Sequence, residues 1–328
     1  MHVFDKIIPF LSERLQRHGS AILFGSHERI PLKKESFASI QPTVGPSMIF
    51  VDGGNGEVVK GPNVSVQFVR LYATQYDDNV RVSRTLREMF VVVLAYQKGL
   101  DLGFEATLFD REGAELEKFS FDAFDPALCW AGRRADPATV ANHIRKLFEI
   151  RLCEELCNNL SAGDIVVRDG DLEAQDELMK QAMLSLRTIG QRKGVVVLGL
   201  SKTSTLCTDS GNSALVALRA IAPVGAWSYY AGGSISFVKL HPGSEYVFRC
   251  DIFPHDREFL PRAWSALAAN SADPAFLGYP YGLIDADKFA QVPKDETEQL
   301  RARFAVQSRE VFRSIEAALD AHDILNSF

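Results

Sequence analysis

Two aspartates in this chain each follow an apolar run and each precede a glycine. Asp52 lies in SMIFVDGG (Ser47 to Gly54), and Asp169 lies in IVVRDGDL (Ile165 to Leu172). Mg²⁺ and Mn²⁺ are hard cations that prefer carboxylate oxygens, and two such ions can stabilise the attacking and leaving oxygens of a phosphodiester. One Asp-Gly at a strand end is also an ordinary turn signal. Two of them after apolar strands favour the metal-site interpretation.

A third carboxylate is expected from the helix that precedes the second aspartate. Glu149 lies beside Phe148 and Ile150, so it could face the core, and it is the preferred candidate. Glu154 is the alternative, although it and Glu155 could equally be solvated helix charges. The order strand-Asp, helix-Glu, strand-Asp is that of a metal-dependent phosphoryl-transfer site of the ribonuclease H type.

Two further segments carry residues that could take part in catalysis. Lys202, in LGLSKTS, follows a buried strand and could contact a phosphate or a carboxylate ligand, or be an ordinary strand-end lysine; no P-loop pattern GxxxxGK[ST] is present. Tyr279 is followed by Pro280, which restricts the backbone on both sides of the peptide bond. The Tyr-Pro-Tyr turn suits stacking or a phosphate hydrogen bond, but such turns also serve packing alone.

Bulk properties restrict the class of protein. The chain has 328 residues and a net charge of -6, which is not the basic balance of a generic nucleic-acid binder. Its start is amphipathic and lacks a signal-peptide pattern, and no stretch approaches the ~20 apolar residues of a membrane span. Cys153 and Cys157 could share a helix face, but with no histidine nearby reduced thiols are preferred over a metal site. These features predict a cytoplasmic protein.

Apolar periodicity predicts an α/β fold in one elaborated domain. The first half should form three strands in an antiparallel meander and then a helix capped by Asp136, with an irregular stretch at 103–132 between them. A β-α-β unit with parallel strands and a hairpin should follow. The expected helices are 2–16, 136–160, 172–192 and 294–325, and the expected strands are 48–52, 63–73, 88–96, 165–168, 195–200, 234–240 and 245–252.

Four segments together resemble the NurA family of prokaryotic nucleases. The resemblance covers about Phe50 to Ala290, and the order and spacing of the segments carry it. The late hairpin FVKLHPGSEYVFRCDI at 237–252 is similar as well. The four segments are FVDGG at 50–54, VVRDGDL at 166–172, GLSKTS at 199–204 and GYPYGLIDAD at 278–287.

The resemblance implies a ribonuclease H-like mixed sheet flanked by helices, with a core at about 45–290 and terminal helices as extensions. It implies a Mn²⁺- or Mg²⁺-dependent deoxyribonuclease, a single-strand endonuclease and 5′–3′ exonuclease, that acts as a homodimer beside a hexameric HerA-type ATPase in double-strand break processing. Asp52 and Asp169 become metal ligands, Glu149 (or Glu154) the helix carboxylate, and Tyr279 the active-site tyrosine.

One position departs from the family pattern. Eight residues after the tyrosine the archaeal pattern has a histidine, whereas this chain has Asp287. An aspartate could bind metal or orient a water, but it cannot act as a neutral imidazole acid-base. The departure motivates an alternative function, a non-catalytic DNA-clamping subunit of a translocase. An ATP-handling relative of the fold is less favoured, because no glycine-rich phosphate loop is present.

The sequence also leads to predictions about geometry and partners. Asp52 and Asp169 should lie on adjacent strands within metal-bridging reach, and Tyr279 and Asp287 should approach them. The N-terminal helix, with its apolar residues 7, 8, 10 and 11, should pack on the protein's own core or, as the second choice, dock a partner. A dimer could line a central DNA channel with Arg145, Lys146, Lys202 and Arg249.

Overall fold

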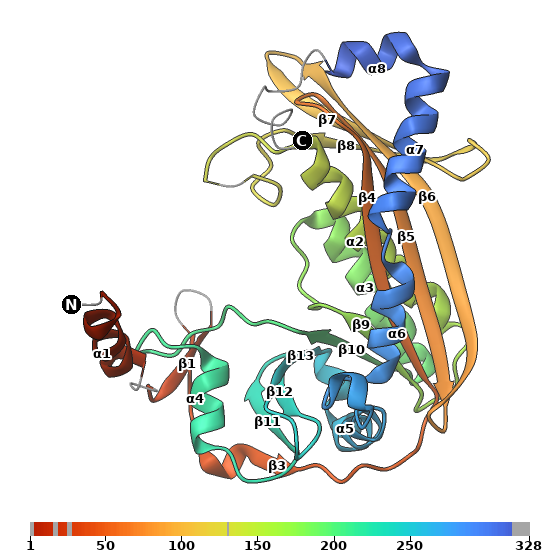
Figure 1. Cartoon of the computed structure of the whole chain (residues 1–328). Coiled ribbons are helices and arrows are strands. Elements are labelled where there is room, and N and C mark those ends of the chain that lie inside the picture. Colours follow the sequence, from red (N-terminus) through yellow and green to blue (C-terminus); the bar gives the residue numbers. More distant parts are fainter. Residues whose placement is uncertain (1–2, 16–18, 25–27, 130, 317–328) are drawn as a thin grey trace.

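A computed structural model describes residues 3–15, 19–24, 28–129 and 131–316 of the chain. A mixed sheet of eleven strands runs through it, and its helices flank both faces, so the predicted α/β class is confirmed (Figure 1). From one edge to the other the strands are β3 (Phe37–Ser39), β11 (Trp227–Gly232), β12 (Ile235–Lys239), β13 (Phe248–Ile252), β10 (Val196–Ser201), β9 (Ile165–Asp169), β4 (Met48–Lys60), β5 (Val64–Asp77), β6 (Val80–Lys98), β7 (Asp101–Phe109) and β8 (Glu115–Asp122).

The predicted antiparallel meander is present, and it is longer than expected. Strand β4 does not end at Asp52 but continues through the glycines to Lys60, paired with β5 along its length. The prediction of an irregular stretch at 103–132 was wrong, because β7 and β8 fill its first part. Phe104, Ala106 and Leu108 alternate into the core with period two, which is the pattern of a half-buried strand.

Two helices cover one face of the sheet. Helix α2 (Pro137–Cys157) begins as predicted, with the Asp136 side chain accepting a hydrogen bond from the Ala138 backbone amide. Helix α3 (Glu177–Lys193) begins five residues later than expected, where Asp176 caps it. The β-α-β unit and the late hairpin are both confirmed, since β9 and β10 pair in parallel and β12 and β13 pair antiparallel.

The opposite face is covered by α5 (Leu260–Ala269) and α6 (Tyr281–Ala290), whose apolar side chains pack on Phe50, Leu200 and Phe248. The remaining elements lie at the periphery. They are α1 (Phe4–Leu15), the hairpin β1 (Ala21–Phe24) and β2 (Glu28–Pro31), α4 (Ala214–Ile221), α7 (Lys294–Gln307), α8 (Arg309–Glu316), and the 3-10 turns η1 (Lys34–Ser36), η2 (Pro254–Phe259) and η3 (Pro274–Phe276).

Both terminal helices differ from expectation. Helix α1 stands at one tip of the molecule and buries none of its residues, so the preferred interpretation, packing on its own core, was wrong (Figure 1). The C-terminal helix is broken at Ser308 into α7 and α8, and the predicted part after residue 316 lies outside the described residues. No described helix is long and apolar enough to cross a membrane.

Glycines let α6 lie directly on β4. A Cβ placed on Gly54 would lie 2.2 Å from the Ala290 carbonyl oxygen, and one placed on Gly282 would lie 2.0 Å from the Phe50 ring. Real Cβ atoms do not approach other atoms this closely, so only glycine permits the contact. The two glycines therefore set the height of α6, including Asp287, above Asp52.

Replacing Gly54 with alanine should lower the free energy of unfolding by about 2 kcal/mol or more, because the new methyl group would meet a backbone oxygen that cannot rotate away. Urea denaturation measures the change. Gly45→Ala is the matched control, since its new Cβ would have its nearest neighbour at 3.9 Å. Equal stability of the two variants would contradict the close packing of α6 on β4.

Candidate metal centre

The two aspartates of the sequence prediction lie side by side on one face of the sheet. Strands β4 and β9 pair in parallel with Phe50 opposite Val167, and both of these side chains are in the core beneath α5 and α6. Side chains two residues apart on a strand point to the same face. Asp52 and Asp169 therefore project together toward α6, as predicted.

Asp287 on α6 completes a cluster of three carboxylates. One oxygen from each of Asp52, Asp169 and Asp287 can be chosen so that all three lie within 4.8 Å of one another. Asp287 is the seventh residue of its helix, not near its start as expected, and the close packing of α6 on β4 brings it into place. Three converging carboxylate oxygens fit a hard divalent cation, and Asp287 supplies one of them.

Lys202 partly balances this negative charge. Its Nζ lies 2.7 Å from Asp169 Oδ2 and 3.0 Å from Asp287 Oδ1. Partial burial lowers the pKa of Lys202, but the two carboxylates outweigh this effect and leave the pKa above its ordinary value. The amine of Lys202 therefore stays protonated and carries a positive charge beside the carboxylate cluster.

Tyr279 lies beneath the cluster. It is only 1% exposed, and its ring packs on Phe248, with the Lys202 ammonium 5.5 Å from the ring centroid. Its hydroxyl has no hydrogen-bond partner of good geometry among the described residues. Burial, and then the charges of Asp169 and Asp52, raise the pKa of Tyr279. The phenol thus stays protonated beside the Asp169 carboxylate, with which it forms no hydrogen bond of good geometry.

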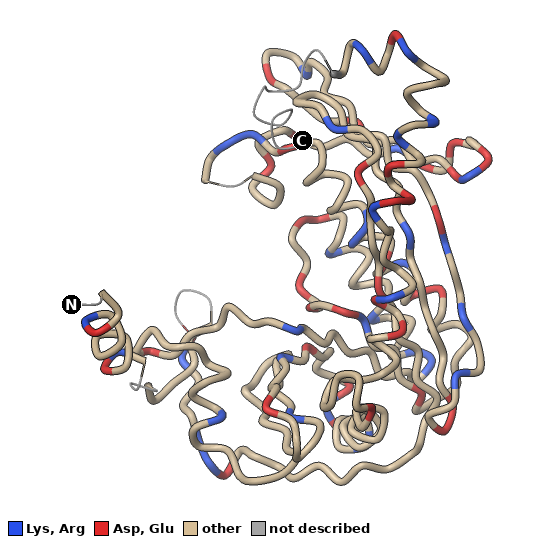
Figure 2. The backbone as a smooth tube through the Cα atoms, viewed as in Figure 1, with Lys and Arg blue, Asp and Glu red and all other residues tan. Residues whose placement is uncertain are grey.

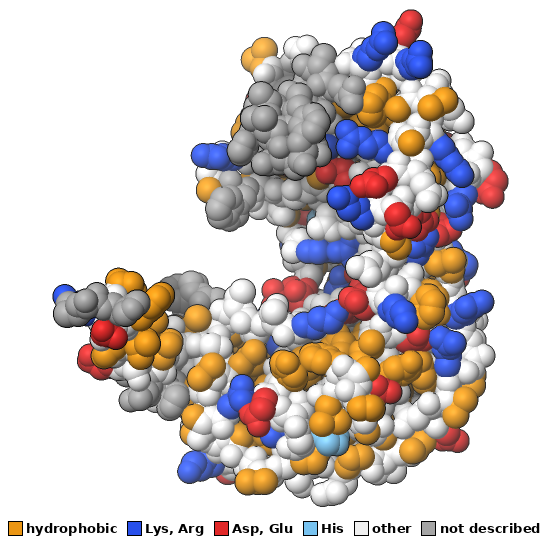
Figure 3. Space-filling view, viewed as in Figure 1, with side chains coloured by type: hydrophobic (Ala, Val, Ile, Leu, Met, Phe, Trp, Pro, Cys, Tyr) orange, Lys and Arg blue, Asp and Glu red, His pale blue; other side chains and the backbone are white. Residues whose placement is uncertain are grey.

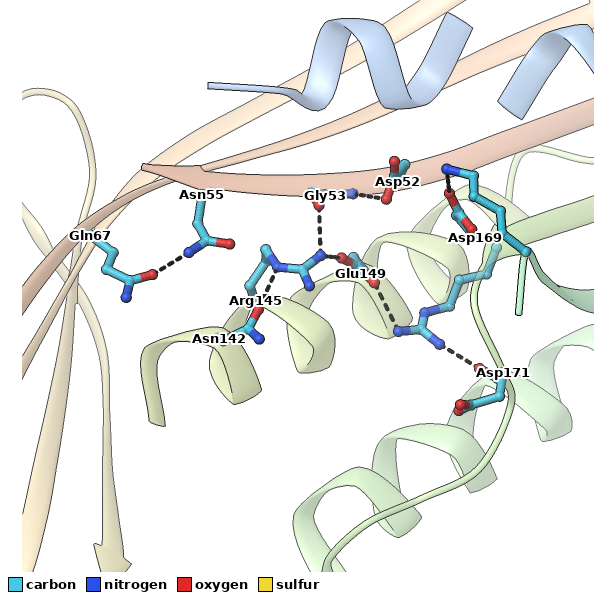
Figure 4. A network of polar contacts seen from close by, with 11 residues as sticks. Asp52, Gly53, Asn55, Gln67, Asn142, Arg145, Glu149, Asp169 and Asp171 are labelled. Carbon is cyan, nitrogen blue, oxygen red and sulfur yellow. Dashed lines mark hydrogen bonds and ion pairs between the residues drawn. The ribbon is translucent and has the colours of Figure 1, made fainter. Parts of the chain in front are cut away.

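Glu149 lies on the other face of the sheet, on α2. It is 1% exposed and forms ion pairs with Arg168 Nη2, at 2.8 Å, and with Arg145. A Cβ on Gly53 would lie 2.5 Å from Glu149 Oε1, so this glycine makes room for the glutamate. Figure 4 shows Glu149 below Asp52 and Asp169 with two contacts to its carboxylate. The third carboxylate of the compact cluster is Asp287, while Glu149 is bound to two arginines.

Of the other predicted residues, some line the cavity at the cluster and others do not. Arg145 and Lys146 line the same cavity of about 310 Å³ as Asp52, Asp169 and Glu149. Glu154 accepts a hydrogen bond from the Ser185 hydroxyl at 2.6 Å and does not line that cavity. The Arg249 side chain is 9% exposed and forms ion pairs with the exposed Glu173 and with the buried Asp251, the latter at 2.7 Å.

Sequence reasoning missed Arg168. This arginine is buried with 5% exposure, and its guanidinium contacts Glu149 and the backbone oxygen of Asp171. The signal was present, since an arginine inside the apolar run IVVRD needs an anionic partner. That partner is Glu149 on the adjacent helix.

Burial, then the negative charges of Asp169 and Glu149, raise the pKa of Asp52 to about 8. In the absence of a divalent cation this carboxyl therefore holds a proton near neutral pH. A cation held by the cluster would compensate the crowded charge, so the residues present fit a metal ligand set.

No protein-family profile matches the chain, and no curated protein sequence matches it. Solved structures do resemble it. The NurA nuclease from Sulfolobus solfataricus has a TM-score of 0.49 at 12% identity, covering 94% of this chain and 95% of that one. The catalytic domain of human Endonuclease V has 0.38 at 12%, covering 92% and 99%. The A. aeolicus Argonaute has 0.34 at 9%, covering 77% and 29%. At these scores the functional argument rests on the site itself.

The raised pKa of Asp52 predicts a pH-dependent stability in the presence of a chelator. Between the ordinary value of 3.8 and about 8 the folded protein holds this proton and the unfolded chain releases it. The free energy of unfolding should therefore fall as pH rises through this window. Asp52→Asn should remove most of that decrease in urea denaturation, and the exposed Asp101→Asn should not. If the free energy of unfolding changed with pH in the same way in wild type and in Asp52→Asn, the raised pKa of Asp52 would be contradicted.

Proposed function

We propose that the protein is a metal-dependent deoxyribonuclease of the NurA type. The observation that carries this proposal is the cluster of Asp52, Asp169 and Asp287 on one sheet face, with a protonated tyrosine and a charged lysine beside it. Carboxylates that converge in this way hold Mn²⁺ or Mg²⁺, and the neighbouring donors suit a negatively charged phosphate. Phosphodiester hydrolysis uses both features.

In the proposed reaction water attacks the phosphorus atom, the bond from phosphorus to the 3′-oxygen breaks, and the released oxygen takes up a proton. Bound metal would polarise the phosphate and lower the pKa of the attacking water. Asp52, Asp169 and Asp287 are the proposed ligands. Glu149 supports the centre from the opposite face through its ion pair with Arg168, at 2.8 Å.

Tyr279 and Lys202 are proposed to contact the phosphate. The unpartnered Tyr279 hydroxyl can donate to a non-bridging oxygen, and burial keeps its proton in place. The Lys202 ammonium is 43% exposed, so it can turn from the carboxylates toward a phosphate that enters the cavity. Donors of this kind act mainly where charge develops in the transition state.

Single strands and DNA ends are the proposed substrates, in the processing of double-strand breaks. The molecule has a C-shaped outline with a hollow between its two arms, which could admit a nucleic acid (Figure 3). Charges of both signs are interspersed along the chain around this hollow (Figure 2). Arg145 and Lys146 bring positive charge to the acidic cavity itself. A mixed surface of this kind favours guided entry over tight unassisted binding.

A homodimer and a hexameric HerA-type ATPase are the proposed partners. Helix α1 supports an interface at the tip of the molecule, because Phe4, Ile8 and Phe10 are each more than half exposed. Apolar side chains gathered on one element are typical of a contact with another chain. Measuring the mass of the purified protein in solution, alone and with such an ATPase, tests this proposal, and a monomer that binds no ATPase would refute it.

Asp52→Asn and Asp169→Asn should each reduce Mn²⁺-dependent cleavage of single-stranded DNA to background, because each removes a proposed ligand charge without changing side-chain volume. Thermal denaturation should also show that Mn²⁺ stabilises the wild type more than either variant. The exposed Asp101→Asn serves as the charge-matched control and should retain full activity.

This experiment also separates the nuclease from the non-catalytic DNA-clamping subunit. A clamp would bind DNA but leave it intact at every Mn²⁺ or Mg²⁺ concentration, with or without the ATPase. Asp287 favours the nuclease, since it adds a carboxylate to the cluster where the family pattern has a histidine. Full cleavage by both asparagine variants would rule out the acidic cluster as the active site.

Tyr279→Phe should lower kcat about a hundredfold while changing the Kd for DNA much less, because the hydroxyl is proposed to act in the transition state. The stability of this variant should change little, since the removed hydroxyl forms no hydrogen bond of good geometry. Asp287→His, which restores the family residue, should shift the metal preference or the pH profile of cleavage. Steady-state kinetics measure these effects. If kcat were unchanged in both variants, Tyr279 and Asp287 would contribute to packing and not to catalysis.

A further inference from the structure

A second cavity, of about 330 Å³, lies between α5 and the strands β3, β11 and β12. It exists because small side chains face the helix at this point of the sheet. Ala38, Ser228 and Ser236 line its sheet side, whereas Trp264 and Leu260 line its helix side. Pockets for small ligands typically combine such an apolar wall with a few polar groups.

The hydroxyl of Ser236 is the first of these polar groups. Ser236 is 1% exposed, and its Oγ has no hydrogen-bond partner among the described residues. Buried hydroxyls are almost always hydrogen-bonded, because an unpaired one loses its interaction with water. The Oγ of Ser236 is therefore available to a molecule that enters the cavity.

Arg257 on η2 is the second polar group. Its guanidinium carbon lies 4.1 Å from the centroid of the Tyr230 ring, and both residues line the cavity. No acidic side chain in the described part of the chain forms an ion pair with it. Arg257 is exposed, and an arginine that is held by stacking and is not paired with a carboxylate is suited to a bound anion such as phosphate.

The cavity lies on the same face of the sheet as the proposed metal centre, and at the same position along the strands. Asp169 is paired across the sheet with Leu200, Leu200 with Cys250, and Cys250 with Ser236. Directly paired residues point to the same face, and three strand spacings of ~4.8 Å place Ser236 roughly 14 Å from the position of Asp169. The two sites are thus separate, yet close enough to serve one nucleic-acid substrate.

We propose that this cavity binds one unpaired nucleotide, with its base against Trp264 and Leu260, an edge of the base on Ser236, and its phosphate on Arg257. The choice of a nucleotide among planar anions rests on the proposed nuclease function. The nucleotide is either free or the 5′-terminal residue of a DNA strand, since both present the same base and phosphate.

Equilibrium dialysis of the full chain against thymidine 5′-monophosphate, in EDTA, tests the proposal. Wild type and Asp169→Asn should bind equally, because the site does not use the metal centre. Arg257→Ala should weaken the Kd about tenfold and Ser236→Ala about fivefold. Arg301→Ala is the matched control, since Arg301 also lies over an aromatic ring, that of Phe312. Thermal denaturation confirms that each variant is folded.

Competition by single-stranded oligonucleotides with and without a 5′-phosphate shows whether the site binds a free nucleotide or the 5′-terminal nucleotide of a strand. Displacement only by the phosphorylated strand assigns the site to a strand end, and no displacement by either strand assigns it to a free nucleotide. Lack of saturable nucleotide binding, or an Arg257→Ala variant that binds like Arg301→Ala, would overturn the proposal. Because binding is measured in EDTA, it can fail while cleavage succeeds, or succeed while cleavage fails.

Discussion

The parallel pairing of β4 with β9 is the constraint on which the site depends. It places Asp52 beside Asp169 on the face of the sheet that α5 and α6 cover. If both carboxyls were ionised, charges within 4.8 Å would repel each other by roughly 3 kcal/mol or more at an effective dielectric constant of ~20. Two features of the site reduce this repulsion. Lys202, which follows β10, lies 2.7 Å from Asp169 Oδ2, and burial, together with the charge of Asp169, raises the pKa of Asp52 so that it is not ionised near neutral pH.

The two faces of the sheet carry different side chains near Asp52 and Asp169. On the α6 side, carboxylates converge on a partly open space. On the α2 side, Glu149 and Arg168 form a buried ion pair that is almost completely shielded from water. Breaking such a pair leaves an uncompensated buried charge, so it fixes the strand beneath Asp169 and the helix beside Gly53. Glu149, the predicted helix carboxylate, thus lines the same cavity as Asp52 and Asp169 and is also paired with two arginines.

Much of this arrangement followed from local sequence patterns. Apolar runs ending in Asp-Gly located β9 and the start of β4, and their order predicted that Asp52 and Asp169 would be neighbours. The position of Lys202 just after β10 followed from the same β-α-β pattern. These features depend on chain order and strand periodicity, which can be read locally.

Other features depend on contacts between distant segments. Which face Glu149 would occupy depended on the rotation of α2 about its axis, set by a core to which β4 through β9 all contribute. The approach of Asp287 depended on Gly54 and Gly282, which are separated by more than two hundred residues. The strands at 101–122 were missed because their exposed edge carries charges and aromatic residues together, which obscures the alternation.

The exposure of the clustered residues decides from which side a substrate can approach. Asp169 is 14% exposed, whereas the side chains of Lys202 and Asp287 are 43% and 57% exposed. The centre thus opens past Lys202, and the buried Tyr279 closes it from below. A divalent cation would compete with the ammonium for the oxygens of Asp169 and Asp287. The lysine displaced in this way would remain at the opening, where the phosphate of the proposed substrate would pass. Under the proposed function, Lys202 would therefore balance the carboxylates in the absence of a cation and contact the substrate when a cation is bound.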